Sequence, residues 1–596
     1  MKVTVTLLVR GGKISTRARA GQTLAAVIQG AGLDLELPCG GHRDCGACQV
    51  HAQGRLSPPT AVELELLGAE KIGQGVRLAC KSKIQGEAGI IVPETLQATN
   101  ILARGTARRT DFNPDISKRL LPPIIPAEGP LLESIKKSLA ETGLAAAPEL
   151  ELAGPEKNSA KGVLTAVSRN GTVDLVEHGD TRAECFGLAV DVGTTTLVVA
   201  LVDLISGREL GTASALNPQV TYGHDVITRI TQVKGKQVSL HHLQAILVRE
   251  LDRLGRELCR RHSLAPARIY EAAVAGNTCM MHLLLGLDPV VLALAPYTSR
   301  IKGSISVRAT ELGFKSLGRA HLYILPPISP FVGGDITAGI LAADLAGGPK
   351  PTLLIDIGTN GEVVLVTENK TFACSVAAGP AFEGMNIACG MRAQPGAIEA
   401  VGIENDGPRL KVIGQGRPRG ICGSGLIDVV AQLREKELID AGGRIAADCA
   451  APSLRPYLRD QNGKRSFLLF ADRSRQVYIS QQDIRQVQLA KGACRAGINL
   501  LLKEAAIGPA AVKRVCVAGA FGYHLKPASL IKIGLLPREW HDRIAFVGNT
   551  AKEGALSVLL NQRLRDEAAR LGRSVLTVDL VSHPEFDRQF IQAMLF

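Results

Sequence analysis

The sequence is poor in aromatic residues. Phe, Trp and Tyr make up 4% of the 596 residues, and there is one Trp. Its cores must therefore be aliphatic, and a hydrophobic fraction of 46% is enough to fill several of them. No apolar stretch reaches the roughly 18 residues that a membrane-spanning helix needs. The start of the chain, "MKVTVTLLVRGGK", alternates like a strand and lacks the apolar segment of an export signal. These absences predict no membrane partner.

A disulfide framework is also absent. Nine of the 13 cysteines stand singly in apolar segments such as "VCVAG" and "FACSV", a pattern typical of buried, reduced thiols. Reduced thiols in a long chain indicate a reducing compartment, so we expect a cytoplasmic protein.

A concentrated basic region is missing as well. The net charge is +13, but Lys and Arg are scattered and form no stripe interleaved with aromatic residues. This distribution argues against a nucleic-acid partner. Solubility alone explains the charge, and an acidic partner surface is the alternative.

Four cysteines do cluster. Three lie in "CGGHRDCGAC" and the fourth in "VRLACKSKI", with the spacing Cys39-x5-Cys45-x2-Cys48-x31-Cys80. Three thiolates on one loop and a fourth on a distant strand are what a [2Fe–2S] cluster needs. A structural zinc site is the alternative, but such sites usually show two C-x2-C knuckles and this sequence has one.

The segments around these cysteines predict a small mixed domain. "KVTVTLLV" and "KISTRARA" read as a hairpin and "TLAAVIQGAG" as a short helix; the strand "CQVHAQGRL" and the helix "TAVELELLGAEKI" follow. Residues 1–94 thus resemble the [2Fe–2S] ferredoxin-like β-grasp fold. The first cysteine gap is one residue longer than the plant-type spacing and is closer to the adrenodoxin-like variant.

The next segments are irregular. Clustered prolines and mixed charge predict a linker over residues 95–125. A small α+β middle domain is expected over 126–184, with a helix in "LLESIKKSLAETG" and a loop in "APELELAGPEKNSAKG". "GVLTAVSRNGTVDLVEHG" predicts a hairpin that turns at Asn170–Gly171.

The rest of the chain contains an internal repeat. "LAVDVGTTTLVVALVDL" begins at residue 188 and "LLIDIGTNGEVVLV" at residue 353. In each, a buried strand carries an aspartate, Asp191 or Asp356, before a tight turn and a second strand. Backbone N–H groups and hydroxyls at such turns suit phosphate oxygens, and the carboxylate suits Mg²⁺ held through water. The alternative is that both are ordinary tight turns.

A third element, "VCVAGAFG" at 515–522, is a buried strand ending in small residues that would let an adenosine lie against the backbone. The set resembles the two-lobed actin–hexokinase–Hsp70 superfamily of ATPases, a ribonuclease H-like fold, over residues 185–596. The resemblance implies a first phosphate turn, a second phosphate turn and an adenosine site. Their residues are Asp191, Gly193, Thr194 and Thr195; Asp356, Gly358, Thr359, Asn360 and Gly361; and Gly519, Ala520 and Gly522.

The match to that superfamily departs in two places. The adenosine motif is less rich in glycine than usual, and no Lys or Arg follows the first phosphate turn closely. Glu362, beside the second turn, is the candidate for positioning the attacking water. A hydrogen-bonding role within the turn is the alternative.

Across its whole length the chain resembles the reductive activators of corrinoid-dependent methyltransferases. Beyond the four cysteines and the linker, the resemblance rests on "DVGTTT", "YGHDVITRI", "AGNTCMMHLLLG", "GGDITAGILAADL", "DIGTNGE" and "VAGAFG". It implies an enzyme that passes an electron from its [2Fe–2S] cluster to inactive Co(II) corrinoid protein, regenerating Co(I), while ATP is hydrolysed. It also implies an upstream low-potential electron donor and a homodimer.

Two other functions remain open on the sequence alone. One is ATP-dependent electron donation to a different enzyme, such as a radical dehydratase. The other is a small-molecule kinase, or a regulator, with a redox sensor attached.

Overall fold

The computed structural model describes most of the chain in two units. The described residues are 2–9, 12–31, 48–92, 105, 111–123, 131–153, 162–223, 225–236, 238–358, 360–446, 452–461, 464–473, 475–519 and 525–596. One unit comprises Met1–Asn100 with the short segments Ala393–Ile398 and Lys411–Arg419, and the other comprises the remainder. Within the described ranges, no helix is both long and apolar enough to cross a membrane.

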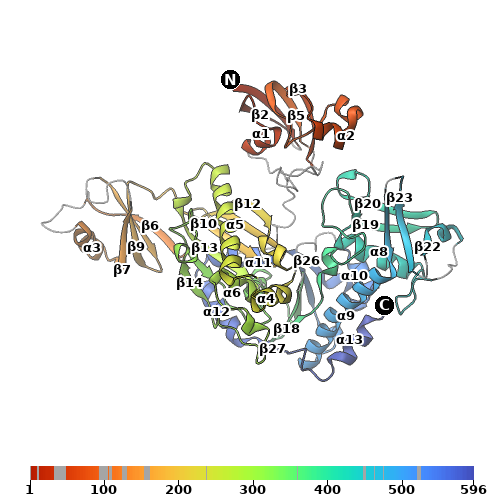
Figure 1. Ribbon diagram of the computed structural model, residues 1–596. Coiled ribbons are helices and arrows are strands. Elements are labelled where there is room, and N and C mark those ends of the chain that lie inside the picture. Colours follow the sequence, from red (N-terminus) through yellow and green to blue (C-terminus); the bar gives the residue numbers. More distant parts are fainter. Residues whose placement is uncertain are drawn as a thin grey trace. The chain divides into compact units, whose positions relative to one another are not determined.

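The N-terminal unit is built on a five-stranded mixed sheet of order β2-β1-β5-β3-β4. Figure 1 labels strands β2, β3 and β5 of this sheet and the helices α1 and α2 beside it. Strand β1 pairs antiparallel with β2 and parallel with β5. Alternate residues of β1, Val5 and Leu7, are fully buried in one core with Leu24 and Ile28 of helix α1. The bounds are β1 Lys2–Val9, β2 Gly12–Arg19, α1 Leu24–Gly30, β3 Gln49–Leu56, α2 Ala61–Gly73, β4 Val76–Leu78 and β5 Ile84–Ile91. The predicted β-grasp fold, its hairpin and its helices are confirmed.

A four-stranded sheet of order β6-β8-β9-β7 follows, with α3 beside it. Its hairpin β8–β9 turns at Asn170–Gly171, as predicted. The bounds are β6 Ile116–Leu120, α3 Leu131–Glu141, β7 Ala145–Ala153, β8 Leu164–Arg169 and β9 Thr172–His178.

Two segments of this sheet differ from expectation. Strand β7 occupies part of the predicted loop "APELELAGPEKNSAKG", and β6 lies within the predicted linker. Pro148 and the charged residues of β7 suggest a loop, but an edge strand tolerates proline, and parallel pairing with β9 buries Leu150. The predicted loop over 147–153 is therefore wrong. In the other segment, Ile116 is buried and β6 pairs with β8.

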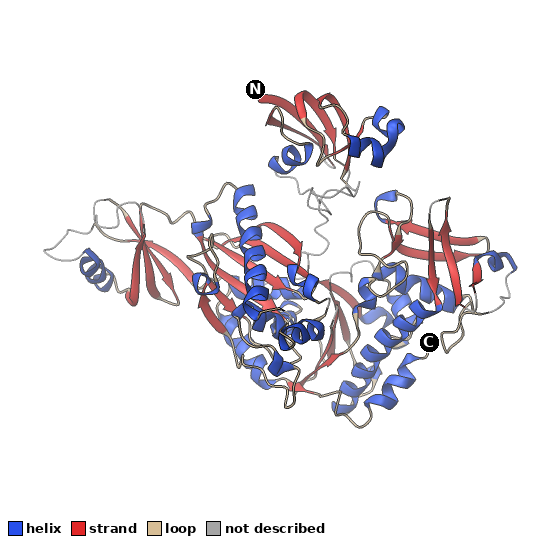
Figure 2. Cartoon of the chain, viewed as in Figure 1, coloured by secondary structure: helices blue, strands red, loops and turns tan. Residues whose placement is uncertain are grey.

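The rest of the chain forms two lobes, each built on a six-stranded sheet, and the two sheets repeat one topology. Figure 2 shows their strands in red and the surrounding helices in blue. Their orders are β12-β11-β10-β13-β15-β14 and β26-β25-β16-β17-β18-β27. In each lobe an antiparallel hairpin is flanked by a third antiparallel strand and by a parallel neighbour. The predicted internal repeat and the two-lobed architecture are confirmed.

The strands of the first lobe are β10 Phe186–Val192, β11 Thr196–Asp203, β12 Glu209–Leu216, β13 Ile269–Gly276, β14 Ile305–Arg308 and β15 His321–Ile324. Those of the second are β16 Thr352–Ile357, β17 Gly361–Val366, β18 Thr371–Val376, β25 Arg514–Ala518, β26 Ile544–Gly548 and β27 Leu576–Thr577. Two three-stranded sheets consist of β19 Ala397–Glu404, β20 Gly407–Val412 and β21 Gly420–Ile421, and of β22 Leu458–Gln461, β23 Lys464–Ala471 and β24 Gln476–Ser480.

Helices α7 and α11 join the two lobes. A Cβ atom on Gly554 of α11 would lie 2.2 Å from the carbonyl oxygen of Ala338 in α7, so glycine permits this close packing. Ile336 and Ile340 of α7 enter the core of the second lobe, and Leu341 enters the core of the first. The helices are α4 Val226–Lys234, α5 Leu240–Arg261, α6 Thr278–Leu285, α7 Gly334–Ala342, α8 Gly423–Glu435, α9 Gln481–Glu504, α10 Pro527–Lys532, α11 Thr550–Leu560, α12 Arg563–Ser574 and α13 Phe586–Met594.

A buried ionic cluster ties the four-stranded sheet to the first lobe. Lys118 Nζ lies 3.0 Å from Glu177 Oε2 and donates to the Tyr270 hydroxyl at 2.6 Å. Arg268 and Arg319 each place a guanidinium nitrogen 2.8 Å from the other carboxylate oxygen of Glu177. Three cations thus converge on one carboxylate.

Replacing this carboxylate should destabilise the protein strongly. Glu177→Ala leaves the three cations without their anion, and breaking a buried pair costs about 3–5 kcal/mol of unfolding free energy. Chemical denaturation measures the change. The matched control is Asp180→Ala, which removes an exposed pair with Arg182 and should leave the transition in place. Equal shifts for the two variants would contradict this account.

Candidate functional site

Two of the four predicted cluster ligands lie within the described ranges. Cys48 immediately precedes β3, and Cys80 follows β4 by two residues. Their Sγ atoms are 3.2 Å apart, and neither forms a disulfide. Cys39 and Cys45 lie outside the described residues. Two thiols from distant segments therefore meet as ligands of one metal centre would, which fits the donor set of an iron–sulfur cluster.

A buried carboxylate holds the segment that carries Cys80. Glu63 of α2 accepts hydrogen bonds from Arg77 Nε at 3.0 Å, from the Leu78 N–H at 3.1 Å and from Ser82 Oγ at 2.5 Å. Burial alone would raise the pKa of Glu63, but these donors lower it to about 2. The ionised side chain thereby fixes the backbone on both sides of Cys80.

The first predicted phosphate turn, Gly193–Thr195, connects β10 to β11. The Gly193 N–H donates to the Thr196 carbonyl at 3.0 Å, which closes the turn. Asn217 Nδ2 donates to the Gly193 carbonyl at 2.9 Å. Side chains outside the turn therefore take part in holding its backbone.

The second predicted phosphate turn connects β16 to β17. The Gly358 N–H donates to the Asn360 carbonyl at 3.2 Å, and Gly361 begins β17. Thr359 lies outside the described residues. The two turns are thus built alike, each closed by a glycine N–H.

One contact runs between the turns of the two lobes. Thr195 Oγ1 donates to Glu383 Oε2 at 3.4 Å, and Glu383 follows β18 of the second lobe. A Cβ atom on Gly358 would lie 4.0 Å from Glu383 Oε1. The structure therefore brings the two predicted phosphate turns to the same region between the lobes.

Gly519 of the predicted adenosine element lies against the second phosphate strand. It has a φ of +114°, and a Cβ atom there would lie 2.2 Å from the Ile357 carbonyl oxygen and 3.4 Å from Asp356 Oδ1. Glycine is required by both the backbone conformation and the space. Ala520 and Gly522 lie outside the described residues, so the adenosine contacts remain a prediction.

Four carboxyl groups gather near the two turns. Asp191 is the penultimate residue of β10, the first hairpin strand, and accepts a hydrogen bond from Asn549 Nδ2 at 2.8 Å. Asp356 and Glu362 lie opposite each other in the second hairpin, and Asp335 lies in the first turn of α7. Among the described residues, no Lys, Arg or His forms an ion pair with any of these four carboxyl groups.

Burial and mutual repulsion shift the titration of this group. Burial raises the pKa of Asp191 to about 6, although the Asn549 hydrogen bond opposes the shift. Burial and the neighbouring aspartates raise the pKa values of Asp335 and Asp356 to about 7, and the pKa of Glu362 lies well above its usual value. Within the described residues these four carboxyl groups pair with no cation. A cation bound nearby would stabilise their ionised forms.

Sequence reasoning missed three side chains at this site. Asp335 lies in "GGDITAGILAADL", a motif to which the sequence alone assigns no role. Asn277 and Asn549 stand in a repeated Gly-Asn-Thr tripeptide that follows a strand and begins a helix, α6 or α11. Each asparagine caps its helix through Oδ1, while its Nδ2 reaches the site, at Thr194 Oγ1 and at Asp191 Oδ2, both at 2.8 Å. The repeated tripeptide was the available signal.

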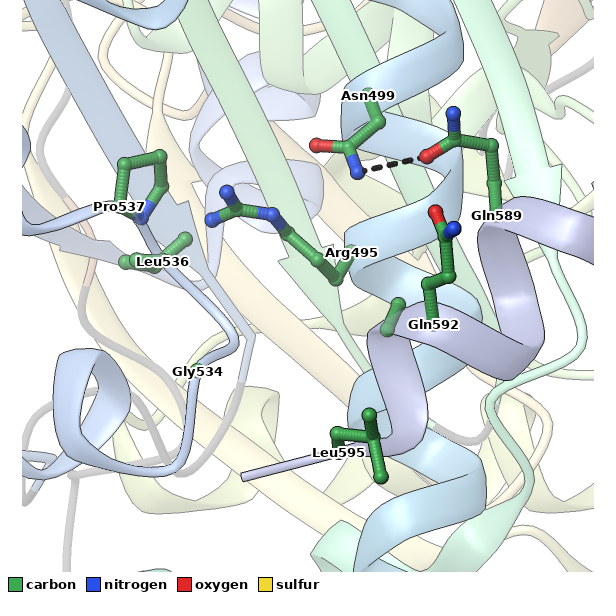
Figure 3. A pocket seen from close by; sticks show the side chains of 9 residues that line it. Arg495, Asn499, Gly534, Leu536, Pro537, Gln589, Gln592 and Leu595 are labelled. Atoms are coloured by element: carbon green, nitrogen blue, oxygen red, sulfur yellow. Dashed lines mark hydrogen bonds between the residues drawn. The ribbon is translucent and has the colours of Figure 1, made fainter. Parts of the chain in front are cut away.

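A cavity of about 300 Å³ lies elsewhere, between α9, α13 and the segment after α10 (Figure 3). Asn499 Nδ2 donates to Gln589 Oε1 at 3.1 Å across it. Its lining contains none of the residues predicted for the cluster or the nucleotide. The lining residues are Arg495, Asn499, Gly534, Leu536, Pro537, Gln589, Gln592, Ala593 and Leu595.

Family models match three regions of the chain. The 2Fe-2S iron-sulfur cluster binding domain matches residues 7–85, the RACo middle region matches 186–347, and the C-terminal ASKHA domain of RACo matches 350–596. The corrinoid activation enzyme RamQ of Eubacterium limosum is 30% identical over 586 residues, covering 96% of this chain and 95% of RamQ. This chain belongs to the RACo family.

Two further proteins that act on corrinoid proteins, by their names, are similar to this RACo-family protein. The [Co(II) methylated amine-specific corrinoid protein] reductase of Methanosarcina barkeri is 26% identical over 65% of this chain and 73% of its own. The solved structure of a reductive activator for a corrinoid, iron–sulfur protein is 30% identical, covers 100% of this chain and 98% of its own, and superposes with a TM-score of 0.72. The predicted family, iron–sulfur domain and ATPase-type fold are confirmed.

The thiol pair gives a direct test of the cluster site. In Cys80→Ser the visible absorption and the electron paramagnetic resonance signal of the reduced cluster should be lost or strongly altered, because one of four thiolate ligands is gone. Cys422→Ser is the matched control, since this buried thiol lies in the ATPase-type lobes, and its spectrum should equal that of the parent protein. An unchanged spectrum in Cys80→Ser would show that this residue is not a ligand.

Proposed function

We propose that the protein is an ATP-dependent reductive activator, which transfers one electron from its [2Fe–2S] cluster to inactive Co(II) corrinoid protein and regenerates Co(I). The observation that carries the proposal is the union in one chain of a thiol pair in a 2Fe-2S domain and a two-lobed ASKHA fold. Full-length similarity to corrinoid activators supports this substrate class over other acceptors.

The N-terminal domain is the electron-carrying part of this proposal. Cys39, Cys45, Cys48 and Cys80 hold the cluster, and Glu63 fixes the segment that carries the last ligand. When bound, a plant-type cluster supplies single electrons near about −400 mV.

The two lobes are the nucleotide-binding part. The first and second turns bind the phosphates through backbone N–H groups and threonine hydroxyls, and Gly519 with Ala520 and Gly522 contacts the adenosine. Mg²⁺ is held near the two turns through water, since Mg²⁺ usually keeps several of its waters and is bound by only one or two carboxylates together with substrate phosphates. The four carboxyl groups near the turns, which form no ion pair among the described residues, supply the negative charge that the ion requires.

Two residues are candidates for positioning the attacking water. A general base works best when its pKa is near the working pH, and burial and neighbouring carboxylates bring the pKa of Asp335 to about 7. Glu362 has a pKa raised well above its usual value and is buried. Asp335 is only half-buried and lies at the N-terminus of α7, so it is the better placed of the two.

Nucleotide turnover offsets an unfavourable electron transfer. An acceptor harder to reduce than the cluster by ~100 mV costs about 2.3 kcal/mol per electron. Nucleotide states that differ in affinity for the corrinoid protein can supply this difference. An upstream low-potential donor, a homodimeric assembly and a cytoplasmic location belong to the same proposal.

The test mixes reconstituted protein, a reductant and a Co(II) corrinoid protein under anaerobic conditions and records visible spectra before and after Mg-ATP. The Co(I) band should appear after ATP is added. Two variants test the electron-carrying part and the nucleotide-binding part separately. The Cys80→Ser protein should hydrolyse ATP without forming Co(I). Asp335→Asn should keep the cluster spectrum but lose about 10²–10⁴-fold in ATP-dependent rate.

Two outcomes would count against the proposal. Co(I) formed equally fast without nucleotide would remove the role of ATP. No Co(I) with several corrinoid partners, despite a reduced cluster and bound ATP, would favour a different low-potential acceptor.

A further inference from the structure

A buried arginine lies behind the first phosphate turn. Arg229 of α4 is 0% exposed, and its Nη2 donates to the Thr194 backbone carbonyl. Its Nε donates to the Gly223 carbonyl at 2.9 Å, and its Nη1 lies 3.3 Å from Gln219 Oε1 and 3.1 Å from Met280 Sδ. Every partner named here is uncharged.

Within the described ranges, no carboxylate lies at ion-pair distance from Arg229. The acidic groups that act on it electrostatically are the Cys279 thiol and Asp225, which caps α4. Burial lowers the pKa of Arg229 to about 10, so the group remains a cation at neutral pH. A buried cation without a counter-ion is unfavourable, which indicates that an anion completes the site when a ligand is bound.

The hydrogen bond to Thr194 determines where that anion can act. In a trans peptide the C=O and N–H point in opposite directions. With the Thr194 carbonyl turned toward Arg229, the N–H of Thr195 in the same peptide is turned away from it. Asn217 holds the Gly193 carbonyl one peptide earlier and so orients the N–H of Thr194 in the same way. The two side chains fix consecutive peptides of the turn.

We propose that Arg229 is the cation of the first phosphate turn, a positioning residue that acts on a bound triphosphate through the Thr194–Thr195 peptide. The proposal deepens, and rests on, the proposed binding of ATP at this turn. Hydrogen bonding to a cation polarises the peptide, so its N–H becomes a stronger donor to a phosphate oxygen. The fold thus supplies the positive charge that the sequence near the turn lacks.

Arginine suits this position better than lysine. Its planar fork has five donors and reaches the Thr194 carbonyl, the Gly223 carbonyl and the Gln219 amide at once. Lysine would keep the charge but lose part of this geometry.

The experiment measures binding of Mg-ATP and of adenosine to the full chain by calorimetry. In Arg229→Met and Arg229→Gln the Kd for ATP should rise about ten- to hundredfold, the range of a charge-assisted hydrogen bond. Adenosine should bind unchanged, because it carries no phosphate. Arg229→Lys should recover most of the ATP affinity, and the ligand-free Arg229→Met protein should melt no lower than the parent, since a buried unpaired charge is gone.

Asn217→Ala is the matched control, because it removes a neutral support of the same turn. It should weaken ATP less than Arg229→Met and leave the salt dependence of ATP binding unchanged, whereas the neutral Arg229 variants should reduce that dependence.

Unchanged ATP affinity in both neutral variants, or equal losses for ATP and adenosine, would overturn the role of Arg229. Failure of both neutral variants to fold would do the same by making Arg229 structural. A parent protein that binds no ATP would overturn the proposed function itself.

Discussion

Repulsion among four carboxyl groups, of which Glu362 is buried and the other three are half-buried, is the constraint around which the two lobes are organised. Asp191 and Asp356 come from equivalent hairpins, Asp335 from the start of α7, and Glu362 from the strand opposite Asp356. Like charges in so little water can coexist only if they stay protonated or if positive charge is supplied. The fold supplies partial positive charge from the N-termini of α7 and α11, which both begin at the site.

The repeated topology explains why these groups meet. Each lobe presents a hairpin turn at the same end of its sheet, and α7 and α11 cross between the lobes with glycine at their contact. Helix α7 contributes side chains to both cores, so a change in one lobe is felt by the packing of the other. The contact of Thr195 with Glu383 adds a polar link between the lobes. Such an arrangement suits a protein in which a ligand bound between the lobes changes their relative orientation.

Local patterns in the sequence were sufficient for much of this account. The strand–turn–strand repeats, the β-grasp elements and the spacing of the cysteines depend on residues close together in the chain. Strand β7 was not predictable, because a proline-containing edge strand forms only when its partner β9 is in place. Asn277, Asn549 and Asp335 were missed as site residues for a related reason: each reaches the turns through the topology of a lobe, although motifs around them were visible.

The central claim is that the four carboxyl groups form the Mg-nucleotide site. The most direct test is to count the protons released when Mg-ATP binds. Calorimetric titration with preformed Mg-ATP is repeated in buffers that differ in ionisation enthalpy. With the pKa values of Asp335 and Asp356 raised to about 7, part of the group is protonated near pH 7, and an incoming cation should expel those protons. We predict net proton release at pH 7 that fades toward pH 9, where the aspartates are already ionised. Binding without proton release at pH 7, or with proton uptake, would contradict the account.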